Sequence, residues 1–363
     1  MMLEMEISGT WLRDNCSCAQ CKHPISGQKL IKIGDVSPDT AIRATEQDGE
    51  SLKVSFEPDG HESVFDAAWL RNWWNDDEHR VPADDRAEDA KLLWERNDIA
   101  TLPAWDWNEY RGESAARFEV LDSVMRRGFA LLRGVPTQEQ FVLRVAESFG
   151  FVRTTNYGAW FDVRVEAKPT NLAFTDLPIS PHTDNPYRDP VPTIQVLHCL
   201  QNAAIGGDSA LLDGFRAADL LRRNEPELFD ILTSTPVSFA FRSPNASLQA
   251  TKPMIGTDGY GRITEVRFNN RSLQPVQLSA RQTERFYQAY RAFAEIVERE
   301  DLQFQFRLEA GDCVIFDNSR LLHARTAFRG SPDGQGKRHL QGCYADLDSL
   351  ASEWRLLAEA RDD

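Results

Sequence analysis

The stretch Ser180-Pro-His-Thr-Asp-Asn-Pro-Tyr187 places a His-x-Asp pair, His182 and Asp184, between two prolines. Prolines stiffen the backbone and disfavour a helix, so we expect a rigid loop here. A further histidine, His323, follows the apolar run 313–316 far downstream. Two imidazoles and one carboxylate are the ligand set of non-haem Fe(II) sites that keep positions open for a co-substrate and O2. The pattern therefore predicts an iron site formed by His182, Asp184 and His323.

The surroundings of the pair strengthen this prediction. Alone the pair is weak, because about 0.5 His-x-Asp pairs are expected by chance in a chain of this composition. The apolar segment 193–200 behind the loop is typical of a strand. Arg338 lies downstream of His323 and offers a planar fork of donors that suits a carboxylate. We therefore expect an anionic co-substrate beside the iron.

Composition sets the class of protein. The chain has 363 residues, of which 41% are hydrophobic and 27% charged, an ordinary globular balance. The net charge of −15 argues against a nucleic-acid or anionic-membrane surface, since both require a basic face. Residues 1–7 contain no long apolar stretch, and no run approaches about 18 apolar residues. We therefore expect a cytoplasmic protein without a signal peptide or membrane span.

The order of strand and helix candidates predicts two domains. Residues 1–90 are expected to form a small β domain, in which 52–56 alternates apolar and polar and Asp66 caps a short helix. In residues 91–363, many short strands with turn signals favour a β-barrel or jelly roll over a parallel doubly wound sheet. The predicted helices there are 115–127, 137–149, 215–232 and 279–300, and the predicted strands are 128–135, 193–200, 209–213, 235–242, 262–268, 304–308, 313–317 and 339–345.

Three cysteines, Cys16, Cys18 and Cys21, lie close together near the N-terminus. Three thiolates and one histidine form a closed tetrahedral zinc site, which is structural rather than catalytic. His23 is the nearest candidate for the fourth ligand, and His61, after a Pro-Asp-Gly turn, is the other. The remaining cysteines lie in apolar strand candidates and are expected to be buried, reduced thiols: Cys199, Cys313 and Cys343.

Together these features resemble the γ-butyrobetaine dioxygenase and trimethyllysine dioxygenase family of Fe(II)/2-oxoglutarate oxygenases. The resemblance covers nearly the whole chain in order and is closer to the butyrobetaine branch. The matching stretches are Trp11-Leu-Arg-Asp-Asn-Cys16, His182-Thr-Asp184, Gln195-Val-Leu-His-Cys199, Gly206-Gly-Asp-Ser209, Asp213-Gly-Phe215, Phe268-Asn-Asn270, Asp317-Asn318, Leu321-Leu-His323 and Arg338-His-Leu-Gln-Gly342.

The resemblance implies a mainly β fold with helices (α+β): a double-stranded β-helix (jelly-roll) catalytic core and a small N-terminal zinc-binding β domain, in a homodimer. It assigns His182, Asp184 and His323 to iron. It places Arg338 on the distal carboxylate of 2-oxoglutarate, with Ser209 as a hydroxyl partner. It also favours His61 over His23 as the zinc ligand.

The implied substrate is a small trimethylammonium zwitterion, with γ-butyrobetaine giving L-carnitine as the first choice. A quaternary ammonium has no N–H to donate and is best recognised by aromatic ring faces. The candidates for that role are Tyr157, Trp160, Phe161, Phe174 and Tyr344, and those for the anionic end are Asn171, Asn270, Arg271 and Arg188.

This chain departs from the animal butyrobetaine enzymes at two positions that bear on the substrate. Phe174 and Asn185 each stand where a Tyr is usual. The alternative substrate is therefore 2-trimethylaminoethylphosphonate, whose phosphonate Arg188, Arg242 or Arg271 would bind. Two different classes also remain open: a non-catalytic, cupin-like metal-binding protein, and a zinc hydrolase, which would leave Arg338 and Ser209 without a role.

Overall fold

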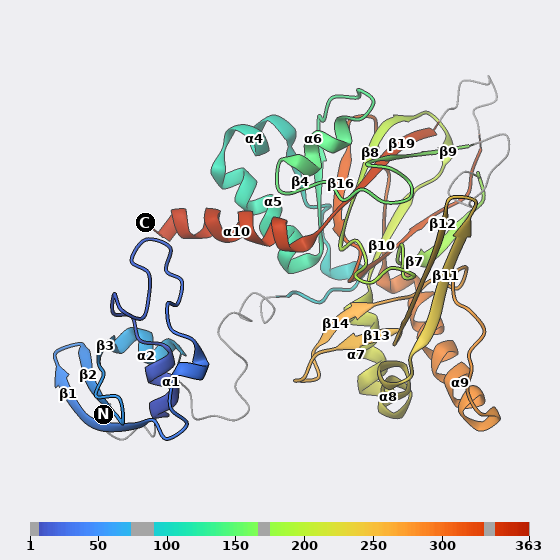
Figure 1. The fold of residues 1–363 in the computed structure, drawn as a ribbon. Coiled ribbons are helices and arrows are strands. Elements are labelled where there is room, and N and C mark those ends of the chain that lie inside the picture. Colours follow the sequence, from blue (N-terminus) through green and yellow to red (C-terminus); the bar gives the residue numbers. More distant parts are fainter. Residues whose placement is uncertain (1–6, 74–90, 166–174, 330–337, 363) are drawn as a thin grey trace. The chain divides into compact units, whose positions relative to one another are not determined.

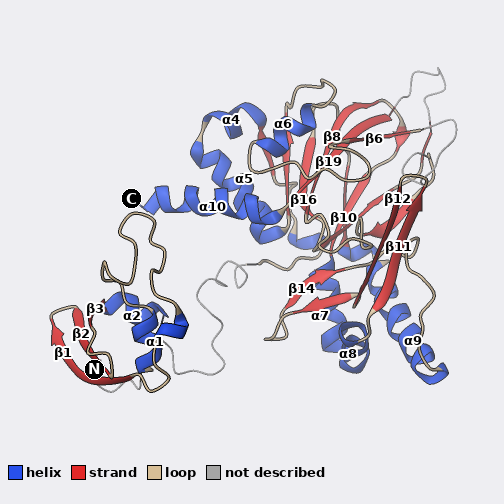
Figure 2. Ribbon diagram, in the orientation of Figure 1, coloured by secondary structure: helices blue, strands red, loops and turns tan. Residues whose placement is uncertain are grey.

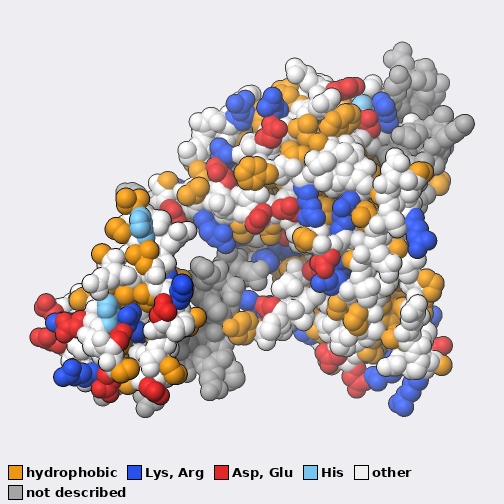
Figure 3. Space-filling view, in the orientation of Figure 1, with side chains coloured by type: hydrophobic (Ala, Val, Ile, Leu, Met, Phe, Trp, Pro, Cys, Tyr) orange, Lys and Arg blue, Asp and Glu red, His pale blue; other side chains and the backbone are white. Residues whose placement is uncertain are grey.

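The computed structural model describes residues 7–73, 91–165, 175–329 and 338–362. The chain divides into two compact units, Met1–Asp89 and Ala90–Asp363, which are described separately (Figure 1). No helix in the described ranges is both long and apolar enough to cross a membrane. On the face drawn in Figure 3, basic and acidic side chains are interspersed rather than gathered by sign.

The first unit is a three-stranded antiparallel sheet, with one α-helix before it and one after it along the chain. Residues 52, 54 and 56 are buried, as the alternation predicts, and they form its core with Leu12, Phe65 and Leu70. The carboxylate of Asp66 accepts a hydrogen bond from Trp69 N at 2.8 Å, which confirms the predicted helix cap. The elements are α1 (Gly9–Asp14), η1 (Ile33–Asp35), β1 (Ala41–Asp48), β2 (Ser51–Glu57), β3 (Glu62–Asp66) and α2 (Ala67–Trp73).

The second unit contains two sheets that share a core. Apolar side chains of both sheets, such as Leu131, Leu211, Phe316 and Leu340, form one buried cluster between them. Apart from the parallel pair β4–β5, the strands of this sandwich pair antiparallel, and the arrangement confirms the predicted jelly roll (Figure 2). The strand order in the larger sheet is β4 (Ala104–Asp106), β5 (Phe129–Arg133), β16 (Cys313–Asp317), β8 (Ile194–Asn202), β19 (Arg338–Ala345) and β6 (Phe161–Arg164). The strand order in the smaller sheet is β15 (Gln303–Phe306), β10 (Ser209–Asp213), β17 (Leu321–Arg325) and β7 (Ile179–His182).

Helices cover the outer face of each sheet. On the larger sheet, Val124, Val145 and Leu350 pack against Ile194 and Ile315, which point away from the shared core. These helices are α4 (Trp107–Gly112), α5 (Ser114–Arg127), α6 (Phe141–Glu147) and α10 (Leu347–Asp362). Leu212 and Leu322 of the smaller sheet pack in a second cluster with three helices and two hairpins. The helices are α7 (Gly214–Asn224), α8 (Pro226–Ser234) and α9 (Ala280–Val297), and the hairpins are β11 (Val237–Ser243)–β12 (Ala246–Lys252) and β13 (Ile255–Thr257)–β14 (Ile263–Val266). The short elements are η3 (Arg96–Asp98), η5 (Glu300–Leu302), β9 (Ile205–Gly206) and β18 (Phe328–Arg329).

Two predicted helices differ from the structure. The expected helix 215–232 is two helices, α7 and α8, because Pro226 has no N–H to continue α7 and instead begins α8. The expected helix 137–149 begins only at Phe141, because a turn closed by Gln138 N and Pro136 O precedes it and Gln140 adopts a left-handed conformation. Both errors concern element boundaries, and the layers are unaffected.

Candidate active site

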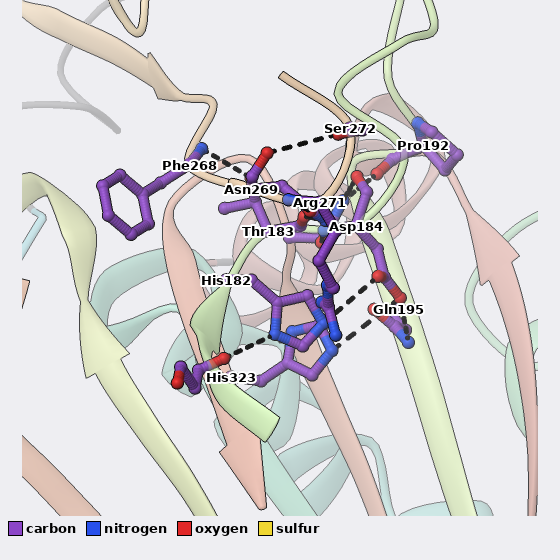
Figure 4. A network of polar contacts seen from close by, with 12 residues as sticks. His182, Thr183, Asp184, Pro192, Gln195, Phe268, Asn269, Arg271, Ser272 and His323 are labelled. Carbon is purple, nitrogen blue, oxygen red and sulfur yellow. Dashed lines mark hydrogen bonds and ion pairs between the residues drawn. The ribbon is translucent and has the colours of Figure 1, made fainter. Parts of the chain in front are cut away.

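Strand register brings the two predicted iron-binding histidines together. His182 ends β7 and lies opposite His323 of β17. Opposite residues of an antiparallel pair point to the same face, and the two ring centroids are 4.2 Å apart. The carboxylate of Asp184 turns back toward them, with Oδ1 3.5 Å from His182 Nε2 and Oδ2 3.7 Å from His323 Nε2. Figure 4 shows this convergence, and each side chain offers one ligand atom within 4.8 Å of the others.

The loop that carries Asp184 is fixed by hydrogen bonds on both sides. The buried side chain of Asn318 accepts from Asp184 N at 2.7 Å and donates to Asp184 O at 3.0 Å and to Pro192 O at 2.9 Å. Thr183 exchanges hydrogen bonds with Phe268, and Asn185 adopts a left-handed φ of 56°, which asparagine tolerates better than most residues. The aspartate is therefore held in place by its backbone as well as its side chain.

The donor set fits a divalent metal ion. His182 Nδ1 donates to Ser180 O at 2.9 Å, which leaves Nε2, the nitrogen that faces Asp184, as the ligand atom for a metal. Burial and the neighbouring His182 lower the pKa of His323 to about 3, so His323 is uncharged at neutral pH. Burial alone would raise the pKa of Asp184, but the two histidines hold it well below its ordinary value. Two imidazole nitrogens and a carboxylate oxygen thus converge, which is a donor set that binds divalent metal ions.

A cavity of about 340 Å³ extends from this cluster into the space between the sheets. Such a volume accommodates a small ligand. The register of β19 turns Arg338, Leu340 and Tyr344 toward it, since alternate residues of a strand share one face. The lining residues are Tyr157, Phe161, Val163, Ile179, His182, Asp184, Asn185, Tyr187, Gln195, Leu197, Ser209, Ala240, Phe241, Asn269, Arg271, Ser272, His323, Ala324, Arg325, Arg338, Leu340 and Tyr344.

One end of the cavity is cationic. Arg338 is buried, and burial lowers the pKa of its guanidinium. Ser209 lies on β10, directly opposite Arg325 of β17. Sequence reasoning missed Arg325, whose pKa is lowered to about 10 by burial and by Arg338. Both guanidinium groups lie over the ring of Phe328, at 4.9 Å for Arg325 and 5.5 Å for Arg338. Two buried cations and a hydroxyl on one wall suit the carboxylate of a small anion.

Another wall of the cavity is aromatic. Of the predicted residues, Tyr157, Phe161 and Tyr344 line it, and the rings of Phe161 and Tyr344 are 5.2 Å apart. Tyr187 and Phe241 also belong to this wall, with centroids 5.2 Å apart, and the hydroxyls of Tyr157 and Tyr187 are 3.0 Å apart. Tyr187 lies only three residues after Asp184, so its position was a usable signal, whereas nothing in the sequence around Phe241 indicates a binding role.

Several predicted pocket residues lie elsewhere. Trp160 packs against the core that the helices cover. It precedes Phe161 by one residue, and neighbouring residues of an extended chain point to opposite faces of a sheet. Asn270 is exposed, and its neighbour Asn269 lines the cavity instead. Arg188 donates to Asn156 and Arg242 is exposed, so neither lines the cavity, whereas Arg271 and Asn185 do. Asn171 and Phe174 lie outside the described residues.

The N-terminal unit contains a second cluster of ligand atoms. His61 Nε2 lies 3.2 Å from Cys16 Sγ and 3.6 Å from the sulfur atoms of Cys18 and Cys21. His23 is directed elsewhere, since its Nδ1 accepts from Ser26 N at 3.0 Å. Of the two candidate histidines, the structure therefore brings only His61 to the cysteines. Three sulfurs and one imidazole nitrogen in this arrangement fit a tetrahedral zinc ion.

Comparisons with known proteins agree with this arrangement. The sequence model of the family "Taurine catabolism dioxygenase TauD, TfdA family" matches residues 96–344, and that of "Gamma-butyrobetaine hydroxylase-like, N-terminal" matches residues 3–71. The chain is 36% identical to the gamma-butyrobetaine dioxygenase of Pseudomonas sp. (strain AK-1), over 94% of this chain and 88% of that one. It is 27% identical to the trimethyllysine dioxygenase of Meyerozyma guilliermondii, over 96% and 89% of the two chains.

A solved structure shares the fold. The non-haem iron oxygenase OrfP, in complex with Fe, succinate and (3S)-hydroxy-L-Arg, superposes with a TM-score of 0.50 at 14% identity, over 66% of this chain and 84% of that one. At this identity the likeness concerns the fold alone. With the family match and the relatives above, the chain belongs to the TauD, TfdA family of dioxygenases, in the group that contains the gamma-butyrobetaine and trimethyllysine dioxygenases.

Proposed function

We propose that this chain is an Fe(II)/2-oxoglutarate-dependent hydroxylase of a small trimethylammonium zwitterion, with γ-butyrobetaine as substrate and L-carnitine as product. The observation that carries the proposal is a cavity in which two histidines and an aspartate, a cationic wall and an aromatic wall meet. The gamma-butyrobetaine dioxygenase of Pseudomonas, at 36% identity, supports this choice of substrate.

In this proposal His182, Asp184 and His323 hold Fe(II), and Arg338 binds the distal carboxylate of 2-oxoglutarate with Ser209 as hydroxyl partner. When bound, the iron and 2-oxoglutarate supply the oxidising power to insert oxygen from O2 into an unactivated C–H bond. The residues of the chain position the reactants. Burial of Arg338 strengthens its attraction for a carboxylate, because the local dielectric is low.

The aromatic wall is suited to the other reactant. The ring faces of Tyr157, Phe161, Tyr187, Phe241 and Tyr344 attract a trimethylammonium group without requiring an N–H donor, at about 0.5–2 kcal/mol per ring. The hydroxyls of Tyr157 and Tyr187 hydrogen-bond to each other. Such a wall orients one end of the substrate, so that one carbon atom is presented to the metal centre.

A second candidate substrate, 2-trimethylaminoethylphosphonate, is favoured by Arg271. This side chain lines the cavity and reaches toward the histidine pair (Figure 4), and no ion pair or side-chain hydrogen bond of Arg271 is found among the described residues. Burial lowers the pKa of its guanidinium, and Asp184 and Tyr187 oppose that shift. A cation that lines the cavity suits the doubly charged phosphonate at least as well as a carboxylate.

For the N-terminal unit we propose a structural zinc ion held by Cys16, Cys18, Cys21 and His61, and for the whole protein a homodimer. The ligand atoms support the first part, and the resemblance to the family supports the second. Zinc content measured by mass spectrometry of metals should be one ion per chain. Light scattering coupled to size exclusion measures the mass of the assembly.

The experiment that tests the proposal is a succinate-release assay with the full chain, Fe(II) and 2-oxoglutarate. The panel contains γ-butyrobetaine, the phosphonate analogue, trimethyllysine and taurine, with His182→Ala as the inactive control. We expect γ-butyrobetaine to stimulate succinate release most. Stronger stimulation by the phosphonate would transfer the assignment to the second candidate, and stimulation by none of the trimethylammonium compounds would refute both.

A further inference from the structure

The buried side chain of Tyr344 contacts both halves of the cavity. Its ring packs 5.2 Å from that of Phe161, as part of the aromatic wall. Its hydroxyl donates a hydrogen bond of 3.1 Å to Asp184 Oδ2. One residue therefore links the wall suited to a trimethylammonium group with the carboxylate of the metal cluster.

Gln195 makes the same contact from the neighbouring strand. It lies opposite Tyr344 in the ladder between β8 and β19, so both side chains point to one face. Its amide Nε2 lies 3.1 Å from Asp184 Oδ2 (Figure 4). The carboxylate only accepts hydrogen bonds, so the nitrogen end of the amide must face it. The carbonyl oxygen of Gln195 is buried and makes no hydrogen bond with the described residues.

The two contacts make the oxygens of Asp184 unequal. Each oxygen lies near one histidine, Oδ1 3.5 Å from His182 Nε2 and Oδ2 3.7 Å from His323 Nε2, but only Oδ2 also accepts from Tyr344 and Gln195. An oxygen that already accepts these two hydrogen bonds has fewer lone pairs left for a metal than one that accepts neither. Oδ1 is therefore the oxygen available to the metal.

Building on the proposed function, we propose that the Tyr344 hydroxyl and the Gln195 amide are positioning groups that hold Asp184 Oδ2, so that the carboxylate takes one metal position through Oδ1. A carboxylate that bound through both oxygens would occupy a further position that the co-substrate or O2 requires. The ring of Tyr344 and its hydroxyl thus have separate roles, the first in substrate binding and the second in metal binding.

These roles are separated by removing the hydroxyl alone. The test titrates the metal-free full chain with Mn(II), without oxygen or substrate, and follows free Mn(II) by electron paramagnetic resonance. Tyr344→Phe and Gln195→Leu should each weaken Mn(II) binding by roughly 10- to 100-fold, the usual effect of losing a partner of a ligand. Tyr157→Phe is the matched control for metal affinity, because it removes another cavity hydroxyl, which hydrogen-bonds to Tyr187 rather than to Asp184. Mn(II) affinity within about twofold of wild type in both test variants would overturn the proposal.

A second measurement excludes general damage to the fold. At saturating Mn(II), Tyr344→Phe should bind γ-butyrobetaine nearly as well as wild type, because the ring face remains, whereas Tyr344→Leu should lose that binding. Equal loss of γ-butyrobetaine binding in both variants would contradict separate roles. Failure of the wild type to bind any trimethylammonium compound would refute the proposed function, while the Mn(II) titrations would still decide the role of the two groups.

Discussion

Replacing Asn318 by alanine tests how far the metal cluster depends on the loop that carries Asp184. The side chain is 1% exposed and makes three hydrogen bonds, to Asp184 N, Asp184 O and Pro192 O. Asn318→Ala leaves these three backbone groups without their partner. At about 1 kcal/mol for each lost bond, the free energy of unfolding should fall by about 3 kcal/mol. For a large domain this corresponds to a decrease in Tm of about 6 °C.

The same substitution should weaken metal binding, because the backbone of Asp184 is no longer fixed against the two histidines. We expect about a tenfold loss of Mn(II) affinity, measured on the metal-free protein. Calorimetry gives the Tm. Asn224→Ala, an exposed position at the end of α7, is the matched control and should change neither quantity. If Asn318→Ala kept the Tm and the Mn(II) affinity of wild type, the loop would not be held as described.

Three further substitutions test the aromatic wall, the cationic wall and the zinc cluster. A Cβ at Gly342 would lie 2.6 Å from Phe161 Cε2, so Gly342→Ala should displace that ring. The KM for γ-butyrobetaine should rise, and the free energy of unfolding should fall by about 1–3 kcal/mol. Unchanged kinetics and Tm would contradict the described aromatic wall. Arg338→Lys loses the forked contact with a carboxylate, worth about 1.5–3 kcal/mol, so the KM for 2-oxoglutarate should rise roughly 10- to 150-fold. A KM near that of wild type would show that Arg338 does not bind 2-oxoglutarate. His61→Ala should abolish zinc binding and lower the Tm without changing the Mn(II) affinity of the iron site. Retention of one zinc ion per chain would exclude His61 as a ligand.

The sequence was sufficient to predict the jelly roll and the convergence of His182, Asp184 and His323. Short apolar strands between turn signals favoured a β-barrel or jelly roll, and the family resemblance selected the jelly roll. The metal cluster rested on ligand types together with that resemblance. The strand pairing that joins His182 to His323 was not visible in the sequence, because it depends on a register between strands far apart in the chain. Ligand type was therefore a better guide than distance along the chain.

The aromatic wall was harder to predict, for a physical reason. A side chain enters the cavity according to strand alternation, and a shift of one residue moves it to the opposite face, as Trp160 and Phe161 illustrate. Phe241 reaches the cavity from β11, whose pairing with β12 carries no sequence signal for a site. Asn269 and Asn270 show the same effect in a loop. Residue type alone does not determine which neighbour faces inward.

The proposed function requires that the metal site in this cavity insert oxygen from O2 into a trimethylammonium substrate. Its most direct test is the reaction of the full chain with γ-butyrobetaine, 2-oxoglutarate, Fe(II) and isotope-labelled O2, followed by mass spectrometry of the products. The proposed function predicts one labelled oxygen atom in L-carnitine and one in succinate, formed in equal amounts. Unlabelled hydroxylated product, or succinate formed without any oxidised trimethylammonium product, would contradict it.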